Sequence, residues 1–155
     1  MRLEYRGYRE SDLINNRASL LLYGGTAAER QEWAKEAQRA FPDEGALRAV
    51  VSSSELAAAL AVSRGVIFLP DITVFERAAQ GRIVRCLRER EERPKIIVGI
   101  PLSPDDAVSR GVLHEDLQYW LRLAQVDLGV LETRNLIHVR RQKALDQQQQ
   151  TTGPT

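Results

Sequence analysis

The chain has 155 residues, a length that fits one domain with a substantial hydrophobic core. Charged residues make up 28% of the sequence and the formal net charge is +1, so no overall field attracts nucleic acid or an anionic membrane. The single cysteine excludes an internal disulfide, the N-terminus lacks a signal-peptide pattern, and no apolar run reaches the roughly 20 residues that span a bilayer. We therefore expect a cytoplasmic protein.

Short apolar segments alternate with helical patterns along the chain. Strands are predicted over 19–23, 47–51, 66–69, 95–100 and 125–130. Helices are predicted over 11–17, from Gly25 to about Ala40, and over 53–62, 74–93, 113–123 and 132–145, with a further turn beginning at 103–106. The segment Val66–Leu69 has no polar alternation, as in a strand that is buried on both faces. This alternation predicts a three-layer α/β/α sandwich with a five-stranded parallel sheet and Val66–Leu69 near its middle.

Several helix boundaries carry local signals. Ser11 is the expected N-cap of the first helix, and Ser52 with Glu55 and Thr73 with Glu76 have capping-box spacing. The helix after Gly25 has an apolar stripe formed by Trp33, Ala37, Ala40 and Phe41. Charges over 85–93 are spaced as i, i+4 pairs, which favours a solvated helix face over a binding patch. We expect one domain over 1–145, followed by a low-complexity, disordered tail over 146–155.

Three segments resemble one family. The buried strand ends IFLPDI, the following helix reads QGRIVRCLRER, and GVLHEDLQYWLRL comes later in the chain. These segments are similar to LFLDEI, QAKLLRVLQER and GRFREDLYYRLNV in the AAA+ ATPase domain of sigma-54-dependent, Fis-family transcriptional regulators. The resemblance covers roughly 20–134 and implies the strand order 5-1-4-3-2. The family's GAFTGA loop is missing between the second and third strands, and at most one helix replaces its helical lid.

The loop after the first predicted strand occupies the position of the family's phosphate-binding loop. The relatives have a sequence such as GESGTGKE, whereas this chain reads GGTAAERQ. Gly24 and Gly25 open the loop, but Glu29 stands at the last glycine position and Arg30 at the lysine position. A glutamate adds bulk and negative charge where the backbone must approach phosphates. Thr26 and Glu29 have capping-box spacing, so we expect a self-capped helix in preference to a working phosphate loop.

The other catalytic positions of the family also differ here. An acid pair normally holds magnesium and orients the attacking water, but Pro70 and Asp71 occupy these positions. Proline offers no side-chain ligand, and we expect Asp71 to be a loop aspartate in preference to a catalytic acid. Pro101 stands at the asparagine of the family's AATN sensor.

The family's two arginine fingers are replaced as well. In the relatives these arginines reach the ATP of a neighbouring subunit, and His114 and Trp120 stand at their positions. Neither side chain supplies the fixed positive charge of an arginine. A stripe at helical spacing, formed by Leu113, Leu117, Leu121 and Ala124, is predicted to face the core. We predict a candidate interface of His114, Tyr119 and Trp120, with a core position of Trp120 as the alternative.

The sequence favours a catalytically inactive AAA+-like domain that acts as a regulatory or protein-interaction module, without a cofactor. One alternative is a divergent ATP-binding domain that uses Arg30 and Asp71 with ATP and magnesium, and a second is a self-associating scaffold. A protein partner or self-association is expected, and a membrane or nucleic-acid partner is not. No zinc cluster or catalytic triad is recognisable. The basic residues His138, Arg140, Arg141 and Lys143 fit a helix C-terminus better than a nucleic-acid site.

Overall fold

A five-stranded parallel sheet forms the centre of the structure, a computed structural model that describes residues 9–130. The strand order is β2-β3-β4-β1-β5, which is the order implied by the family resemblance. The strands are β1 (Leu20–Tyr23), β2 (Arg48–Ala49), β3 (Val66–Leu69), β4 (Lys95–Ile100) and β5 (Gln125–Asp127). The helices are α1 (Glu10–Asn15), α2 (Ala27–Arg39), α3 (Ser53–Ala61), α4 (Arg77–Glu89), α5 (Pro104–Ser109) and α6 (Glu115–Trp120). Two 3-10 turns, η1 (Pro42–Glu44) and η2 (Ile72–Val74), complete the described elements.

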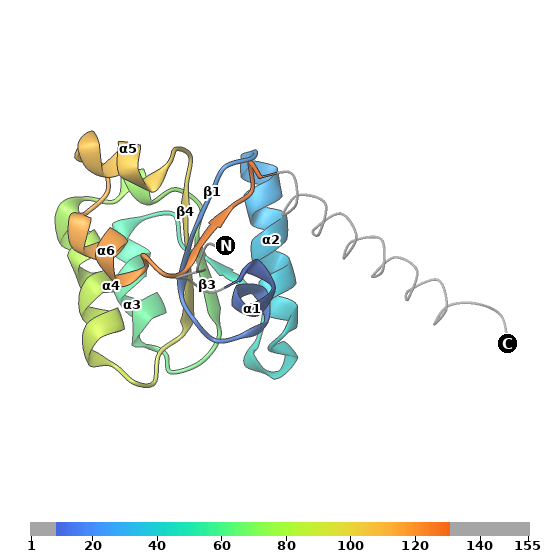
Figure 1. Ribbon diagram of the computed structural model, residues 1–155. Coiled ribbons are helices and arrows are strands. Elements are labelled where there is room, and N and C mark those ends of the chain that lie inside the picture. The colour runs from blue at the N-terminus through green and yellow to red at the C-terminus, as the bar shows by residue number, and fades with distance from the viewer. Residues whose placement is uncertain (1–8, 131–155) are drawn as a thin grey trace, which may run out of the picture.

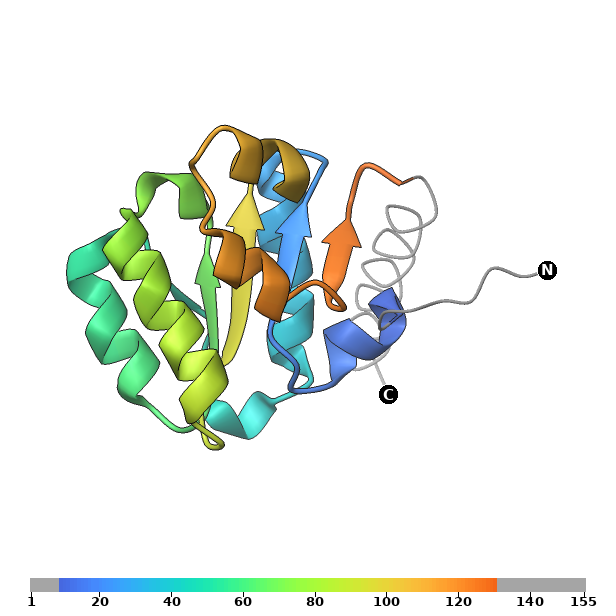
Figure 2. The same ribbon diagram turned by 60° about the vertical axis from the view of Figure 1, so that its left-hand side comes forward.

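The sheet is covered on both faces (Figures 1 and 2). Helices α3, α4 and α6 lie on one side, and α1 and α2 lie on the other. Alternate residues of each strand serve the two sides: Leu21 and Ile67 pack with the α3, α4 and α6 side, whereas Leu20 and Phe68 pack with Trp33 of α2. All four residues of β3 are buried, as predicted for a strand that lies between two helical layers.

Several predicted helix boundaries are wrong. Helix α4 begins at Arg77 and not at Val74, because Asp71 caps a 3-10 turn and Phe75 then enters the core in an extended conformation. It ends at Glu89, so Arg88 pairs with Glu89 at 2.8 Å instead of with a residue one turn further on. Helix α6 is also shorter than predicted and covers only Glu115–Trp120.

Other predictions differ from the structure at the ends of helices α1, α2 and α3. The N-cap of α1 is Arg9 and not Ser11, and it makes no side-chain cap. Ser52 precedes α3 as predicted, but its hydroxyl bonds to the Glu55 carboxylate at 3.1 Å and not to the helix backbone. Ala40 is exposed because α2 has already ended at Arg39. The predicted helix over 132–145 and the tail over 146–155 lie outside the described residues.

A buried lysine ties the first helix to the sheet. Lys95, the first residue of β4, is fully buried. Its Nζ donates to the carbonyl oxygens of Leu13, Asn16 (2.6 Å) and Ala18 (2.9 Å). These carbonyls belong to the end of α1 and to the segment that leads into β1, so one side chain fixes where the N-terminal segment joins the sheet. Within residues 9–130, no helix has both the length and the apolar character that crossing a membrane requires.

Candidate functional site

The candidate site lies at the carboxyl ends of the parallel strands, where β1 passes into α2. Gly24 and Gly25 turn the chain with φ angles of 76° and 65°, a conformation that favours glycine. Gly24 also lies against the turn that follows β5: a Cβ atom there would come within 2.3 Å of Asp127 Oδ1 and 2.6 Å of the Gly129 nitrogen. The loop is thus held from one side by the last residue of β5 and the turn that follows it.

The start of α2 carries the capping box that the sequence predicts. The backbone N–H of Glu29 donates to Thr26 Oγ1 at 3.1 Å, and the backbone N–H of Thr26 donates to Glu29 Oε1 at 2.8 Å. The glutamate therefore folds back over the loop, so that a Cβ atom on Gly25 would lie only 2.8 Å from Oε1. Backbone N–H groups at the start of a helix can bind a phosphate. In this loop one of these groups, the N–H of Thr26, already donates to the Glu29 carboxylate.

Arg30, at the position of the family's phosphate-binding lysine, turns onto the same loop. Its side chain is only 6% exposed, and Nη1 donates to the carbonyl oxygens of Gly24 and Gly25, both at 3.1 Å. Within the described residues, its Nε has no hydrogen-bond partner. Burial lowers the pKa of Arg30, and the carboxylates of Asp71 and Glu29 oppose that shift. The guanidinium therefore stabilises the loop through its two hydrogen bonds, and the negative charges of Asp71 and Glu29 favour its protonated form.

The acid-pair positions also have local structural partners. Asp71 Oδ1 accepts hydrogen bonds from the Thr73 backbone N–H at 2.9 Å and from Thr73 Oγ1 at 2.5 Å, so the carboxylate caps η2. The neighbouring Pro70 lies over β4, since a Cβ atom on Gly99 would be 2.7 Å from the carbonyl oxygens of both Leu69 and Pro70. This close approach leaves little space between the ends of β3 and β4. Residues 9–130 contain no group of three or more His, Cys, Asp or Glu side chains that could hold a metal ion.

His114 has a structural role at the start of α6. Its Nδ1 accepts a hydrogen bond from the Asp116 backbone N–H at 3.0 Å, and its own backbone N–H donates to Gln80 Oε1 at 2.7 Å. Gln80 is buried and its Nε2 bonds to three carbonyl oxygens, those of Ile72, Phe75 and Val112. Gln80 therefore joins η2, α4 and the segment before α6, and it fixes the orientation of α6 against α4.

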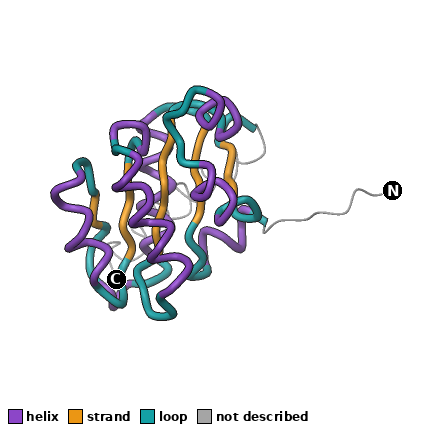
Figure 3. The backbone as a smooth tube through the Cα atoms, turned by 90° about the vertical axis from the view of Figure 1, so that its left-hand side faces the viewer, coloured by secondary structure: helices purple, strands orange, loops and turns teal. Residues whose placement is uncertain are grey.

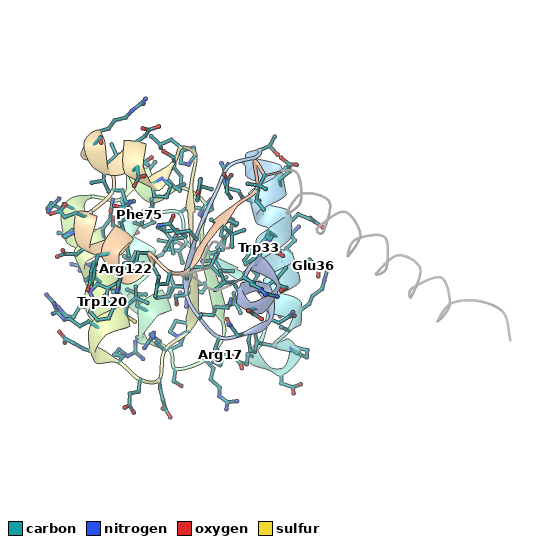
Figure 4. All side chains as sticks on the ribbon, in the orientation of Figure 1. Arg17, Trp33, Glu36, Phe75, Trp120 and Arg122 are labelled. Carbon is teal, nitrogen blue, oxygen red and sulfur yellow. The ribbon has the colours of Figure 1, made fainter. Side chains whose placement is uncertain are left out.

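The remaining two residues of the predicted interface are exposed. Tyr119 is 56% exposed and Trp120 is 43% exposed, and their rings make an edge-to-face contact with centroids 6.3 Å apart. The Arg122 guanidinium carbon lies 4.0 Å from the centroid of the Tyr119 ring, and Leu123 is 44% exposed. In Figure 4, Trp120 and Arg122 lie over α6 and α4, whereas Trp33 lies between α2 and the sheet. We call Tyr119, Trp120, Arg122 and Leu123 the aromatic patch.

The alternative of a core position for Trp120 is thus wrong. The core contacts of this segment come from Leu113, Leu117, Leu121 and Ala124, which are buried as predicted, although only Leu117 lies within the helix itself. The structure separates the predicted site residues into two groups: the loop residues with Asp71 at the sheet edge, and His114, Tyr119 and Trp120 along α6. The sequence pattern did not reveal that Asp127 and Gly129 pack against Gly24, because this contact joins segments about a hundred residues apart.

Comparison with solved structures identifies the fold. The P-loop NTPase domain of the sigma-54 transport activator from E. coli matches with a TM-score of 0.58 and 19% identity, covering 79% of this chain and 91% of that chain. NtrX from Brucella abortus in complex with ADP matches with a TM-score of 0.59 and 16% identity over 88% of this chain. A DNA polymerase III gamma subunit-related protein from Thermotoga maritima matches with a TM-score of 0.56 and 13% identity over 82% of this chain.

This chain therefore has the AAA+ P-loop NTPase-like fold of sigma-54 activator domains, as the resemblance implied. It spans 40% of the NtrX chain in the ADP complex. The sequence matches no known family profile and no curated protein.

Proposed function

We propose that this chain is a catalytically inactive AAA+-like domain that acts as a regulatory or protein-interaction module in the cytoplasm. The observation that carries the proposal is the internal occupation of the phosphate loop. Glu29 accepts from the Thr26 backbone N–H at 2.8 Å, and Arg30 donates to the carbonyls of Gly24 and Gly25. To bind in this loop, a negatively charged triphosphate would have to displace the Glu29 carboxylate, which is also negatively charged.

Two further features support an inactive site. Pro70 supplies no ligand at the first acid position, and the Asp71 carboxylate is engaged by both donors of Thr73. In the ATPases, a magnesium-binding acid and a water-orienting residue must act together with the phosphate loop. A site without the loop glycine, the lysine and the first acid lacks the phosphate-binding loop and the magnesium ligand, and its remaining acid, Asp71, is engaged by Thr73.

The experiment is a calorimetric titration of the purified chain with ATP and magnesium. We expect a dissociation constant weaker than about 1 mM, which corresponds to about −4 kcal/mol. Binding in the micromolar range would support the alternative, a divergent ATP-binding domain that uses Arg30 and Asp71. That alternative draws support from the similarity to NtrX, which was solved in complex with ATP and with ADP.

The aromatic patch supplies a surface for the interaction role. Tyr119 and Trp120 expose apolar area next to one another and Leu123 is exposed shortly after them in the chain; tryptophan and tyrosine are enriched among residues that dominate binding energies. The same patch could bind a second copy of the chain, as in the self-associating scaffold. Sedimentation of the free chain distinguishes self-association from binding to another protein.

A further inference from the structure

A groove separates α3 from α4 on the face of the sheet opposite α2. It has a volume of about 260 Å³, with Leu60 and Cys86 at its base. Ala57 and Ala61 form the α3 side at i, i+4 spacing, and Arg82 and Arg85 stand on the α4 side. Figure 3 shows the two helices side by side in front of the sheet. The small alanine side chains leave room for another backbone to approach closely.

One arginine fixes the width of the groove. Arg90, just beyond the end of α4, donates to the carbonyl oxygens of Leu60, Ala61 (3.2 Å) and Val62 (3.1 Å). These are carbonyls at the C-terminus of α3, which have no partner within their own helix. The two helices are therefore linked at their ends, and a ligand would meet preformed walls and lose little binding energy to ordering them.

The α4 wall is positively charged. Arg82 and Arg85 are exposed, and neither pairs with a carboxylate within residues 9–130. The acidic residue at the groove, Glu89, is paired with Arg88 at 2.8 Å. The whole chain carries a net charge of only +1, so this wall is a local concentration of positive charge and not part of a general basic surface.

We propose that this groove binds an amphipathic helix of a partner protein, with an apolar ridge of small residues and acidic side chains along its edges. The ridge would lie over Ala57, Ala61 and Cys86, and the acids would meet Arg82 and Arg85, as in other helix-in-groove complexes. The segment 132–145 of this chain is a poor occupant, since its charges are mostly basic. The inference extends the proposed interaction function by giving the partner's chemistry.

Two synthetic helical peptides test this pairing, one with an alanine and leucine ridge flanked by glutamates, the other with lysines in place of the glutamates. Fluorescence anisotropy with the full chain at low salt should show at least tenfold tighter binding of the acidic peptide. The double variant Arg82→Glu/Arg85→Glu should weaken that binding about tenfold and favour the lysine peptide. The matched control, Lys35→Glu/Arg39→Glu on α2, has the same net charge and should leave both affinities unchanged.

A second variant tests the apolar floor independently of charge. Ala57→Trp should fill the groove and abolish binding of the acidic peptide, with circular dichroism confirming an intact fold. Absence of binding up to 1 mM, equal affinity for the two peptides, or equal effects of the groove and control variants would overturn the proposal. If the sedimentation of the Arg82→Glu/Arg85→Glu variant changes and that of the control variant does not, the groove mediates self-association. That result would also overturn the proposal. None of these outcomes depends on ATP titration or on Trp120, so the proposed function is tested separately.

Discussion

Within residues 9–130, two buried basic side chains, Lys95 and Arg30, are held by backbone carbonyls and not by carboxylates, and burial lowers the pKa of Lys95 to about 7. Lys95 bonds to three carbonyls at the start of the sheet, and Arg30 bonds to two in the loop at its opposite end. A buried basic group is tolerated when acceptors meet its donors, as they do for the Lys95 amine and for Nη1 but not Nε of Arg30, and it becomes costly when a partner is removed. Arg30 therefore fixes the path of the loop after β1, and Lys95 fixes the end of α1 together with the segment that leads into β1.

Removing the donor of Lys95 should be strongly destabilising. Lys95→Met keeps much of the chain length but leaves the carbonyls of Leu13, Asn16 and Ala18 without their donor. We expect a loss of about 3 kcal/mol in the free energy of unfolding, measured by urea denaturation. Arg64→Met, at an exposed position, is the control and should change stability by less than about 0.5 kcal/mol. A Lys95→Met variant as stable as the control would contradict the role of these bonds.

Disrupting the capping box of α2 should reduce the stability of the protein less than removing Lys95. Thr26→Ala removes the acceptor for the Glu29 backbone N–H and should cost about 1 kcal/mol. Thr26→Ser keeps the hydroxyl and should retain most of the stability. Chemical denaturation of the three proteins measures both differences. An alanine variant equal to or better than the wild type would count against the self-capped loop.

At the scale of elements, prediction from sequence succeeded where one local pattern decided the outcome. The five strands, their order and the capping box at Thr26 follow from apolar runs, capping spacing and the family resemblance, although β2 and β5 are shorter than predicted. The start of α4 was mispredicted because Asp71 competes with Thr73 as a cap, and only the burial of Phe75 decides between them. The role of Lys95 was not predicted, because its partners lie 77 to 82 residues away.

At the candidate site, too, local features could be predicted from the sequence and long-range contacts could not. The replacements at Glu29, Arg30 and Pro70 are visible in the sequence, and so is the capping spacing. The structural role of Arg30 is to donate to the carbonyls of Gly24 and Gly25. This role depends on the three-dimensional position of the guanidinium, which the spacing of residues in the sequence does not give. The α3–α4 groove was likewise not predicted, since α3 and α4 belong to separate parts of the chain.

Helix α6 and the turn after it carry the aromatic patch, whose side chains are exposed and not part of the core. Trp120→Ala should therefore leave the circular dichroism spectrum intact, since Leu117 and Leu121 supply the buried contacts. If the patch is an interface, the variant should weaken self-association or partner binding by about 2 kcal/mol or more. Sedimentation and partner titration measure this. Leu123→Ala, within the same patch, should have a smaller effect, and an unchanged association state in the Trp120 variant would remove this residue from the interface.

At the scale of the whole molecule, a charged cluster joins three separate segments at the amino ends of the strands. Arg17, which precedes β1, pairs with Glu44 of η1 at 2.6 Å and stacks on Phe41 with its guanidinium carbon 4.9 Å from the ring centroid. Glu44 also accepts the Gly65 backbone N–H at 2.7 Å, just before β3. Because these segments are far apart in sequence, the cluster is formed only when the sheet has assembled.

This cluster predicts part of the acid sensitivity of the fold. The hydrogen bond from Arg17, followed by that from Gly65, lowers the pKa of Glu44 below its unfolded value. A lowered carboxyl pKa adds stability above the unfolded pKa of about 4.3, and this contribution is lost as the pH falls through the folded pKa. Glu44→Gln should therefore be less stable than the wild type at pH 7, by less than about 1 kcal/mol because Arg17 is solvent-accessible.

The pH dependence of that difference is the decisive measurement. Urea denaturation from pH 7 down to pH 3 should show the two proteins converging, because the protonated wild-type carboxyl resembles the amide. At pH 7, 0.5 M salt should also reduce the difference, as expected for a partly exposed ion pair. Asp43→Asn, one residue earlier and exposed, is the matched control and at pH 7 should differ from the wild type by less than about 0.5 kcal/mol. A constant difference between wild type and Glu44→Gln at every pH would mean that packing, and not the charge of Glu44, stabilises this edge of the sheet.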